Sequence, residues 1–123
     1  MLNAYPQRSS EPEVVCHHVR LLGTGAANPT KQLGAGIAAT RTSEGLYKLT
    51  WSDNPGTFVG VSHCFGAATP ADLVGHTCVR DTFDTSAYSL EVRVADDADA
   101  ADDLEADEYL DLQVYFKRTA VSA

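Results

Sequence analysis

All three cysteines and all four histidines of the chain gather in three short clusters. The clusters are Cys16-His17-His18, His63-Cys64 and His76-Thr77-Cys78. Residues two apart on a β-strand point to the same face, so Cys16 and His18 share a face, as do His76 and Cys78. If those two strands paired, the four side chains would offer a Cys₂His₂ set for tetrahedral zinc. The C-x-H spacing is not that of a zinc knuckle, and neither pair lies in a turn. We therefore expect thiols buried in the core, histidines at the surface or an interface, and no bound metal.

A glycine-rich stretch, residues 23–28, follows a predicted strand and resembles a nucleotide-binding turn. The dinucleotide fingerprint needs a third Gly or Ala and then a helix whose N-terminus meets the phosphate. Asn28 occupies that third place, and Pro29 and Thr30 follow it without an amphipathic helix. The stretch is therefore predicted to be an irregular loop of a β domain, with no nucleotide cofactor.

Residues 96–108, hereafter the acidic segment, carry 8 of the 17 acidic residues and no basic one. Without this segment the chain is formally neutral, with 9 acidic and 9 basic residues. The order Asp97, Asp99, Ala101 departs from that of a calcium loop, and no glycine allows the sharp turn such a loop needs. We expect a solvated connection in which Leu104 is the only large apolar residue, with one helical turn over 102–107.

The common catalytic signatures are missing from the sequence. It contains no Gly-x-Ser-x-Gly elbow, no His-Glu-x-x-His and no signature of a cysteine nucleophile. The carboxylates outside the acidic segment are scattered. We expect no catalytic residues and no enzymatic activity.

Seven segments alternate apolar and polar residues, the period of a half-buried strand. Turn-forming residues separate several of them, at 43–45, 53–56, 68–72 and 84–86. The sets predicted to face inward are Val15, Val19 and Leu21; Ile37, Ala39 and Arg41; Tyr47, Leu49 and Trp51; Val59, Val61, His63 and Phe65; Thr77, Val79, Asp81 and Phe83; Tyr88, Leu90, Val92 and Val94; and Leu110, Leu112, Val114 and Phe116.

This pattern predicts an all-β fold, an antiparallel β-sandwich of seven to eight strands with at most one short helical turn. Greek-key or jelly-roll wiring is the usual arrangement of such strands, and we expect a jelly-roll-like one, although the sequence does not fix the strand order. A chain of 123 residues and 13.2 kDa, 44% of them apolar, is sized for one domain with a packed core. Residues 1–13, with Pro6 and Pro12, are predicted to be an extended N-terminal arm, and residues 14–123 to be the sandwich.

The charge balance bears on partners and on compartment. With 17 acidic against 9 basic residues the formal charge is -8, which disfavours nucleic acid and anionic membranes as partners. No apolar run approaches the length of a membrane span, and the start of the chain lacks the pattern of a signal peptide. We expect a protein made in the cytoplasm, with Cys16, Cys64 and Cys78 reduced.

Several blocks of sequence between Val19 and Val121 follow one another in a suggestive order. They are residues 20–30 (RLLGTGAANPT), a strand ending in 40–42 (TRT), 45–51 (GLYKLTW), 54–60 (NPGTFVG), the 83–84 corner (FD), the strand 86–95, and 109–115 (YLDLQVY). In these blocks the chain resembles small structural proteins of tailed bacteriophages, and is similar to capsid decoration (cement) proteins. The acidic segment and the Cys-His pairs depart from that family.

The resemblance implies a jelly-roll subunit that forms a homotrimer over junctions between capsid hexamers. The implied partner is the major capsid protein, and the implied location is the virion surface, after assembly in the host cytoplasm. One alternative is a receptor- or glycan-binding β-sandwich module of a phage tail or fibre. Such a site needs clustered exposed aromatic residues, for which only Trp51 and Tyr88 are candidates, and both fit a core better. A second alternative is a small enzyme on a cupin-like sandwich, supported only by the Cys-His clusters.

Overall fold

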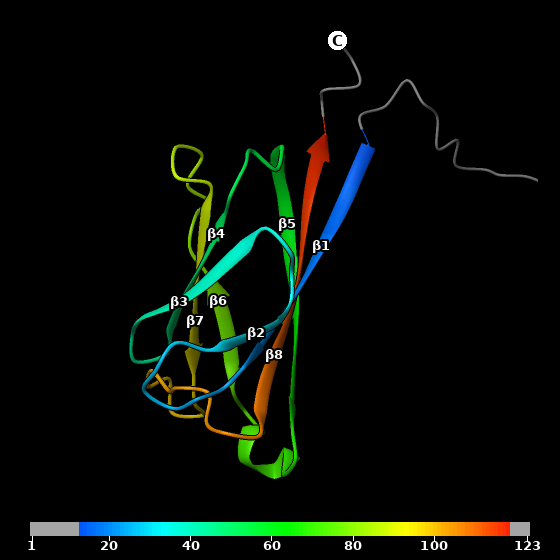
Figure 1. Ribbon diagram of the computed structural model, residues 1–123. Coiled ribbons are helices and arrows are strands. Elements are labelled where there is room, and N and C mark those ends of the chain that lie inside the picture. Colours follow the sequence, from blue (N-terminus) through cyan, green and yellow to red (C-terminus); the bar gives the residue numbers. More distant parts are fainter. Residues whose placement is uncertain (1–12, 119–123) are drawn as a thin grey trace, which may run out of the picture.

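The computed structural model describes residues 13–118, which form an all-β sandwich of two antiparallel sheets (Figure 1). The predicted fold class is therefore confirmed. The strands are β1 (Glu13–Leu22), β2 (Thr30–Leu33), β3 (Ile37–Ser43), β4 (Leu46–Trp51), β5 (Thr57–Ala67), β6 (Thr77–Arg80), β7 (Ser89–Ala95) and β8 (Glu108–Arg118). The predicted arm lies outside the described residues, except that its last residue, Glu13, already belongs to β1.

Sheet A has the strand order β2-β1-β8-β5, and sheet B has the order β3-β4-β7-β6. In a jelly roll the first strand pairs with the eighth, the second with the seventh, the third with the sixth and the fourth with the fifth. Here only β1 and β8 are paired in that way, while β1–β2, β3–β4 and β6–β7 are hairpins within one sheet. The strand order therefore differs from that of a jelly roll, because β2, β3 and β6 each pair with a strand that is adjacent in the sequence.

The core lies between the sheets and follows the predicted alternation in β4, β7 and β8. The side chains of these strands that point inward are almost fully buried: Tyr47, Leu49, Trp51, Leu90, Val92, Val94, Leu110, Leu112, Val114 and Phe116. Four aromatic rings pack together at one end of this core. Phe58 stacks on Phe83 at 5.5 Å between ring centroids, and Trp51 and Phe116 meet edge to face at 5.3 Å.

Two strands face the core with residues other than those predicted. The register of β5 shifts between Phe58 and Gly60, so Phe58 packs against the core while Val59 is 51% exposed. In β6, Cys78 points inward, Val79 is 60% exposed, and the strand ends at Arg80. The bulge in β5 adds one residue to that strand, and period-2 counting on the sequence misses it. β6 pairs with β7 in regular register, so there the prediction assigned the wrong face to the core.

The one helical turn is not in the acidic segment. A 3₁₀-helix, η1 (Pro70–Leu73), lies between β5 and β6 instead, whereas 102–107 has no helix. Proline suits the first turn of a helix because its φ is already fixed and its missing N–H has no helical partner to lose. Residues 102–107 are drawn onto the body of the protein by contacts of Asp103 and Leu104.

Candidate functional site

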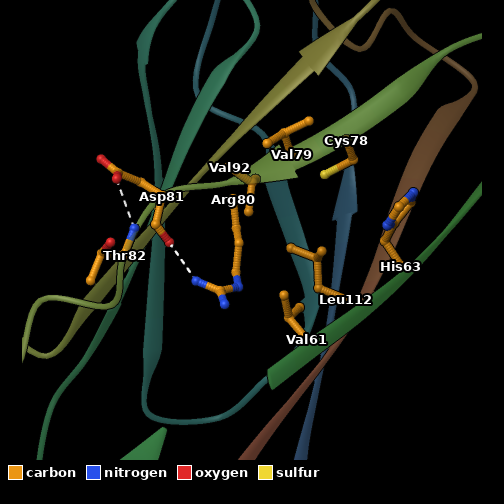
Figure 2. A pocket seen from close by; sticks show the side chains of 9 residues that line it. All are labelled: Val61, His63, Cys78, Val79, Arg80, Asp81, Thr82, Val92 and Leu112. Atoms are coloured by element: carbon orange, nitrogen blue, oxygen red, sulfur yellow. Dashed lines mark hydrogen bonds between the residues drawn. The ribbon is translucent and has the colours of Figure 1, made fainter. Parts of the chain in front are cut away.

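A groove of about 540 Å³ opens between the edge strands β5 and β6, where the two sheets do not close over the core. Its lining includes Val61 and His63 from β5, Cys78 from β6, and the core residues Val92 and Leu112 (Figure 2). Val92 and Leu112 are each only 1% exposed, so the groove reaches the surface of the packed core and stops there. Polar side chains, among them Asp81 and Thr82, line the rest of the groove. An open groove of mixed lining beside a strand edge suits an extended peptide segment.

Arg80 is the main charged side chain of the groove. It extends from the end of β6 (Figure 2). Its guanidinium lies 4.7 Å from the centre of the Phe58 ring. One of its N–H groups donates to the main-chain carbonyl of Asp81 at 3.0 Å. These contacts leave Arg80 along the rim, where it covers aromatic surface while its charge stays in contact with solvent.

Hydrogen bonds near the middle of the acidic segment attach that segment to the sandwich. Asp103, 8% exposed, accepts two hydrogen bonds from the Arg41 guanidinium and one from the main-chain N–H of Gly45, all at 2.8 Å. The hydrogen bond from Arg41 is the main cause that holds the pKa of Asp103 below its usual range. The prediction of a wholly solvated segment is therefore wrong at this residue, because a bidentate arginine offsets the cost of burying the carboxylate.

Leu104 and Asp102 secure the acidic segment on either side of Asp103. Leu104 is 0% exposed, and its main-chain N–H donates to the Tyr47 hydroxyl at 2.7 Å. Burial raises the pKa of Tyr47 to about 12, so the hydroxyl remains protonated. Asp102 lies 2.8 Å from Nε2 of His76, a residue whose side chain is 9% exposed. The segment therefore closes one end of the sandwich, and its exposed carboxylates are the remaining ones, such as Asp97 and Asp107.

The glycine-rich stretch, residues 23–28, also holds the acidic segment against this end of the sandwich. The N–H groups of Gly23 and Gly25 donate to the carbonyls of Glu108 and Leu104, at 2.8 and 2.9 Å. A Cβ on Gly23 would lie 2.5 Å from the Leu104 carbonyl carbon, so only glycine lets the two segments approach this closely. These N–H groups are thus engaged by main-chain carbonyls of the same protein. The packing role of Gly23 was not predicted from the sequence.

Sheet A carries a second cluster of charges on its outward face. Arg20 donates two hydrogen bonds to Asp111, at 2.7 and 3.1 Å, and its guanidinium lies 4.8 Å from the centre of the Tyr109 ring. His18 is 3.6 Å from the same carboxylate. The hydrogen bond from Arg20 is the main reason that the pKa of Asp111 is lowered. The carboxylate is thus committed to an ion pair and is a poor general base.

The Cys-His clusters are not brought together as a metal site. Cys16 and His18 lie on β1 of sheet A, and Cys78 lies on β6 of sheet B, so the strand pairing that zinc would need is not made. Among residues 13–118 no group of three or more His, Cys, Asp or Glu side chains could hold a metal ion.

The thiols themselves differ from the prediction of buried cysteines. Cys16 and Cys64 are exposed on the outward face of sheet A, and only Cys78 is partly buried. Burial raises the pKa of the Cys78 thiol to about 12, which leaves it protonated and a weak nucleophile. The prediction failed because Cys16 and Cys64 occupy the positions of β1 and β5 that face away from the core.

No family model, curated protein or solved structure matches this chain. Within the described residues there is also no helix long and apolar enough to cross a membrane. Function therefore has to be inferred from the side chains, the groove and the strand edges described above.

Proposed function

We propose that this chain is a structural protein of a phage virion, a capsid decoration protein that binds the major capsid protein as a homotrimer. The sequence blocks between Val19 and Val121 support the family. The observation that carries a binding role is the groove beside β5, a long strand whose second edge has no partner strand, because both features suit another polypeptide. We also propose that the protein has no enzymatic activity. In support, the carboxylates of Asp103 and Asp111 already accept hydrogen bonds from arginines.

The acidic segment supports an orientation on the shell. Its exposed carboxylates repel one another and would need a basic partner surface if they were buried against a second protein. We propose that this end of the sandwich points to solvent and that residues 1–13 lead toward the capsid. Because Asp102 and Asp103 hold the fold, the variant that tests this orientation has to spare both of them.

The experiment is cosedimentation of the purified protein with empty shells of the major capsid protein encoded beside its gene. We expect saturable binding, weaker after deletion of residues 1–12, and unchanged when Asp97, Asp99 and Asp107 are all replaced by Asn. Circular dichroism of each variant shows whether the sandwich is intact. Binding that fails in the Asn variant but survives the deletion would reverse the orientation.

The alternative of a glycan-binding tail module has less support. Trp51 is only 5% exposed and Tyr88 is half-buried, so neither candidate aromatic offers an open stacking surface. Binding to host polysaccharide with no binding to capsid shells would favour this alternative.

A further inference from the structure

β5 is the longest unprotected edge of the sandwich. It pairs with β8 on one side only, and its eleven residues, TFVGVSHCFGA, contain no Asp, Glu, Lys, Arg or Pro. The other edge strands have features that discourage pairing with a strand of another chain. β2 and β6 have four residues each and include Lys31 and Arg80, while β3 contains Arg41 and a bulge. β5 has a bulge of its own between Phe58 and Gly60, but residues 60–67 beyond it pair in regular register and carry neither charge nor proline, and such an edge is suited to pairing with another strand.

The surroundings of β5 are also those of an interface. Val79 on β6, 60% exposed, lines the groove that reaches Val92 and Leu112, and Val59 on β5 is 51% exposed. On the outward face of sheet A the side chains of β5 are small: Gly60, Ser62, Cys64 and Gly66. A strand laid beside β5 would cover apolar surface, and along residues 60–64 it would meet only small outward side chains of β5, whereas the Tyr109 ring lies over Gly66 farther along.

We propose that β5 pairs with β5 of a second copy, antiparallel about a two-fold axis, so that the two four-stranded A sheets become one sheet of eight strands. A two-fold contact presents the same patch on both copies and must therefore be self-complementary. β5 meets this condition because it has no formal charge to repel itself. The two grooves would face each other across the axis and shield Val61 and Cys78 from water.

Electrostatics favour the antiparallel direction of this pairing over the parallel one. The acidic segment lies at the C-terminal end of β5, where the N–H of Ala68 donates to the carbonyl of Asp107 at 3.1 Å. Antiparallel pairing puts the two acidic segments at opposite ends of the paired strands. An eleven-residue strand is about 37 Å long, whereas the Debye length in physiological salt is about 8 Å. Parallel pairing would instead place two acidic segments side by side.

The first test compares two lysine variants that differ only in distance from the edge. Ser62 and Gln113 are opposite one another on β5 and β8, both are exposed, and they share a hydrogen bond of 3.0 Å. Ser62→Lys and Gln113→Lys therefore break the same bond and add the same charge. Only Ser62→Lys brings like charges together in the paired strands, which should weaken association about tenfold or more.

Light scattering over a range of protein concentrations measures the mass of the assembly formed by each variant. We expect Ser62→Lys to halve the mass, from dimer to monomer or, if trimers also form, from hexamer to trimer. Gln113→Lys should keep the mass of the unmodified protein. A protein that is monomeric at high micromolar concentration, or an assembly unaffected by Ser62→Lys, overturns the proposal. So does an assembly lost on deletion of residues 1–12, because the occupant of β5 would then be the N-terminal segment.

A cross-linking series locates the axis independently. In a Cys16→Ser background, single cysteines at 60, 62 or 64 all lie on the outward face of β5. A Cβ at Gly60 meets nothing within 4 Å, so that substitution is tolerated. Mild oxidation should link two copies at the position nearest the axis, whereas Gln113→Cys, with Cys64 also replaced by Ser, should stay unlinked. Linking at Gln113→Cys with none along β5 would show that copies meet through the face of sheet A instead.

Discussion

Single residues hold the most acidic part of this chain in place. Composition identifies the acidic segment correctly as a connection between strands, but it treats all eight carboxylates alike. In the structure Asp103 is buried against Arg41, a residue 62 positions away in the sequence. The partner could not be read from the sequence, because which arginine reaches which aspartate depends on the arrangement of the two sheets.

Asp103 should therefore matter far more to stability than its acidic neighbours. Asp103→Asn weakens the bonds to Arg41 and to the Gly45 N–H, and hydrogen bonds to a buried charge are typically worth about 2 kcal/mol. We expect a loss of about that size in urea unfolding. Asp97→Asn, an exposed change of the same charge, should stay within about 0.5 kcal/mol. Equal effects of the two variants would mean that the segment is not anchored at Asp103.

The three thiols should separate into two classes of reactivity. Cys16 and Cys64 are exposed, whereas the thiol of Cys78 is partly buried with a pKa of about 12. A disulfide reagent added to the folded protein at neutral pH should modify Cys16 and Cys64 quickly and Cys78 slowly. Mass spectrometry of the modified peptides measures this, and Cys16→Ser and Cys64→Ser assign the fast sites. Rapid modification of Cys78 would contradict the groove geometry.

The strands show where period-2 counting succeeds and where it fails. In β4, β7 and β8 the predicted inward residues are those that are buried, since each of these strands has neighbours on both sides. In β5 and β6, both at edges, the prediction puts Val59 and Val79 inward, and both are exposed. In β5 the cause is its bulge, which an edge strand accommodates more easily because it has only one neighbour to remain aligned with. In β6, which pairs with β7 in regular register, the apolar Val79 lies on the exposed face and Cys78 faces the core.

Leu104 tests whether the acidic segment is an integral element of the fold. The side chain is 0% exposed and belongs to the core cluster. Leu104→Ala should cost about 3 kcal/mol through lost burial and a cavity, measured by urea unfolding. Glu105→Ala, at the exposed neighbouring position, is the control and should change stability by about 0.5 kcal/mol or less. A small effect of Leu104→Ala would show that this segment detaches without harm to the sandwich.

For the whole molecule, the fold class and the single-domain size follow from the sequence, but the strand order and the groove do not. The order depends on which strands meet across long separations in the chain, as Val15 and Phe116 do in β1 and β8. The groove exists because β5 and β6 lie at the same side of the two sheets without closing it. Neither property is encoded in any one segment.

Acid should destabilise the folded protein. The pKa values of Asp84, Asp96, Asp103 and Asp111 are all lowered by hydrogen bonds from main-chain N–H groups or from arginines. The unfolded chain therefore binds protons first as the pH falls, and stability present above about pH 5 is lost progressively through and below about pH 4. Thermal unfolding followed by circular dichroism at a series of pH values measures the loss. A midpoint that stays constant or rises on acidification would contradict these pKa directions.

The position of β8 in sheet A has a consequence for how the protein is made. β8 is the last strand along the described chain, yet it lies between β1 and β5 and is the only neighbour that β5 has. During translation β1 and β5 emerge from the ribosome long before the strand that pairs with both. Sheet A therefore cannot be completed before β8 has emerged, and its closure is a late event of high contact order. Until then β5, with neither edge paired, is exposed to other nascent chains, so slow synthesis or a chain that stops before β8 should favour aggregation.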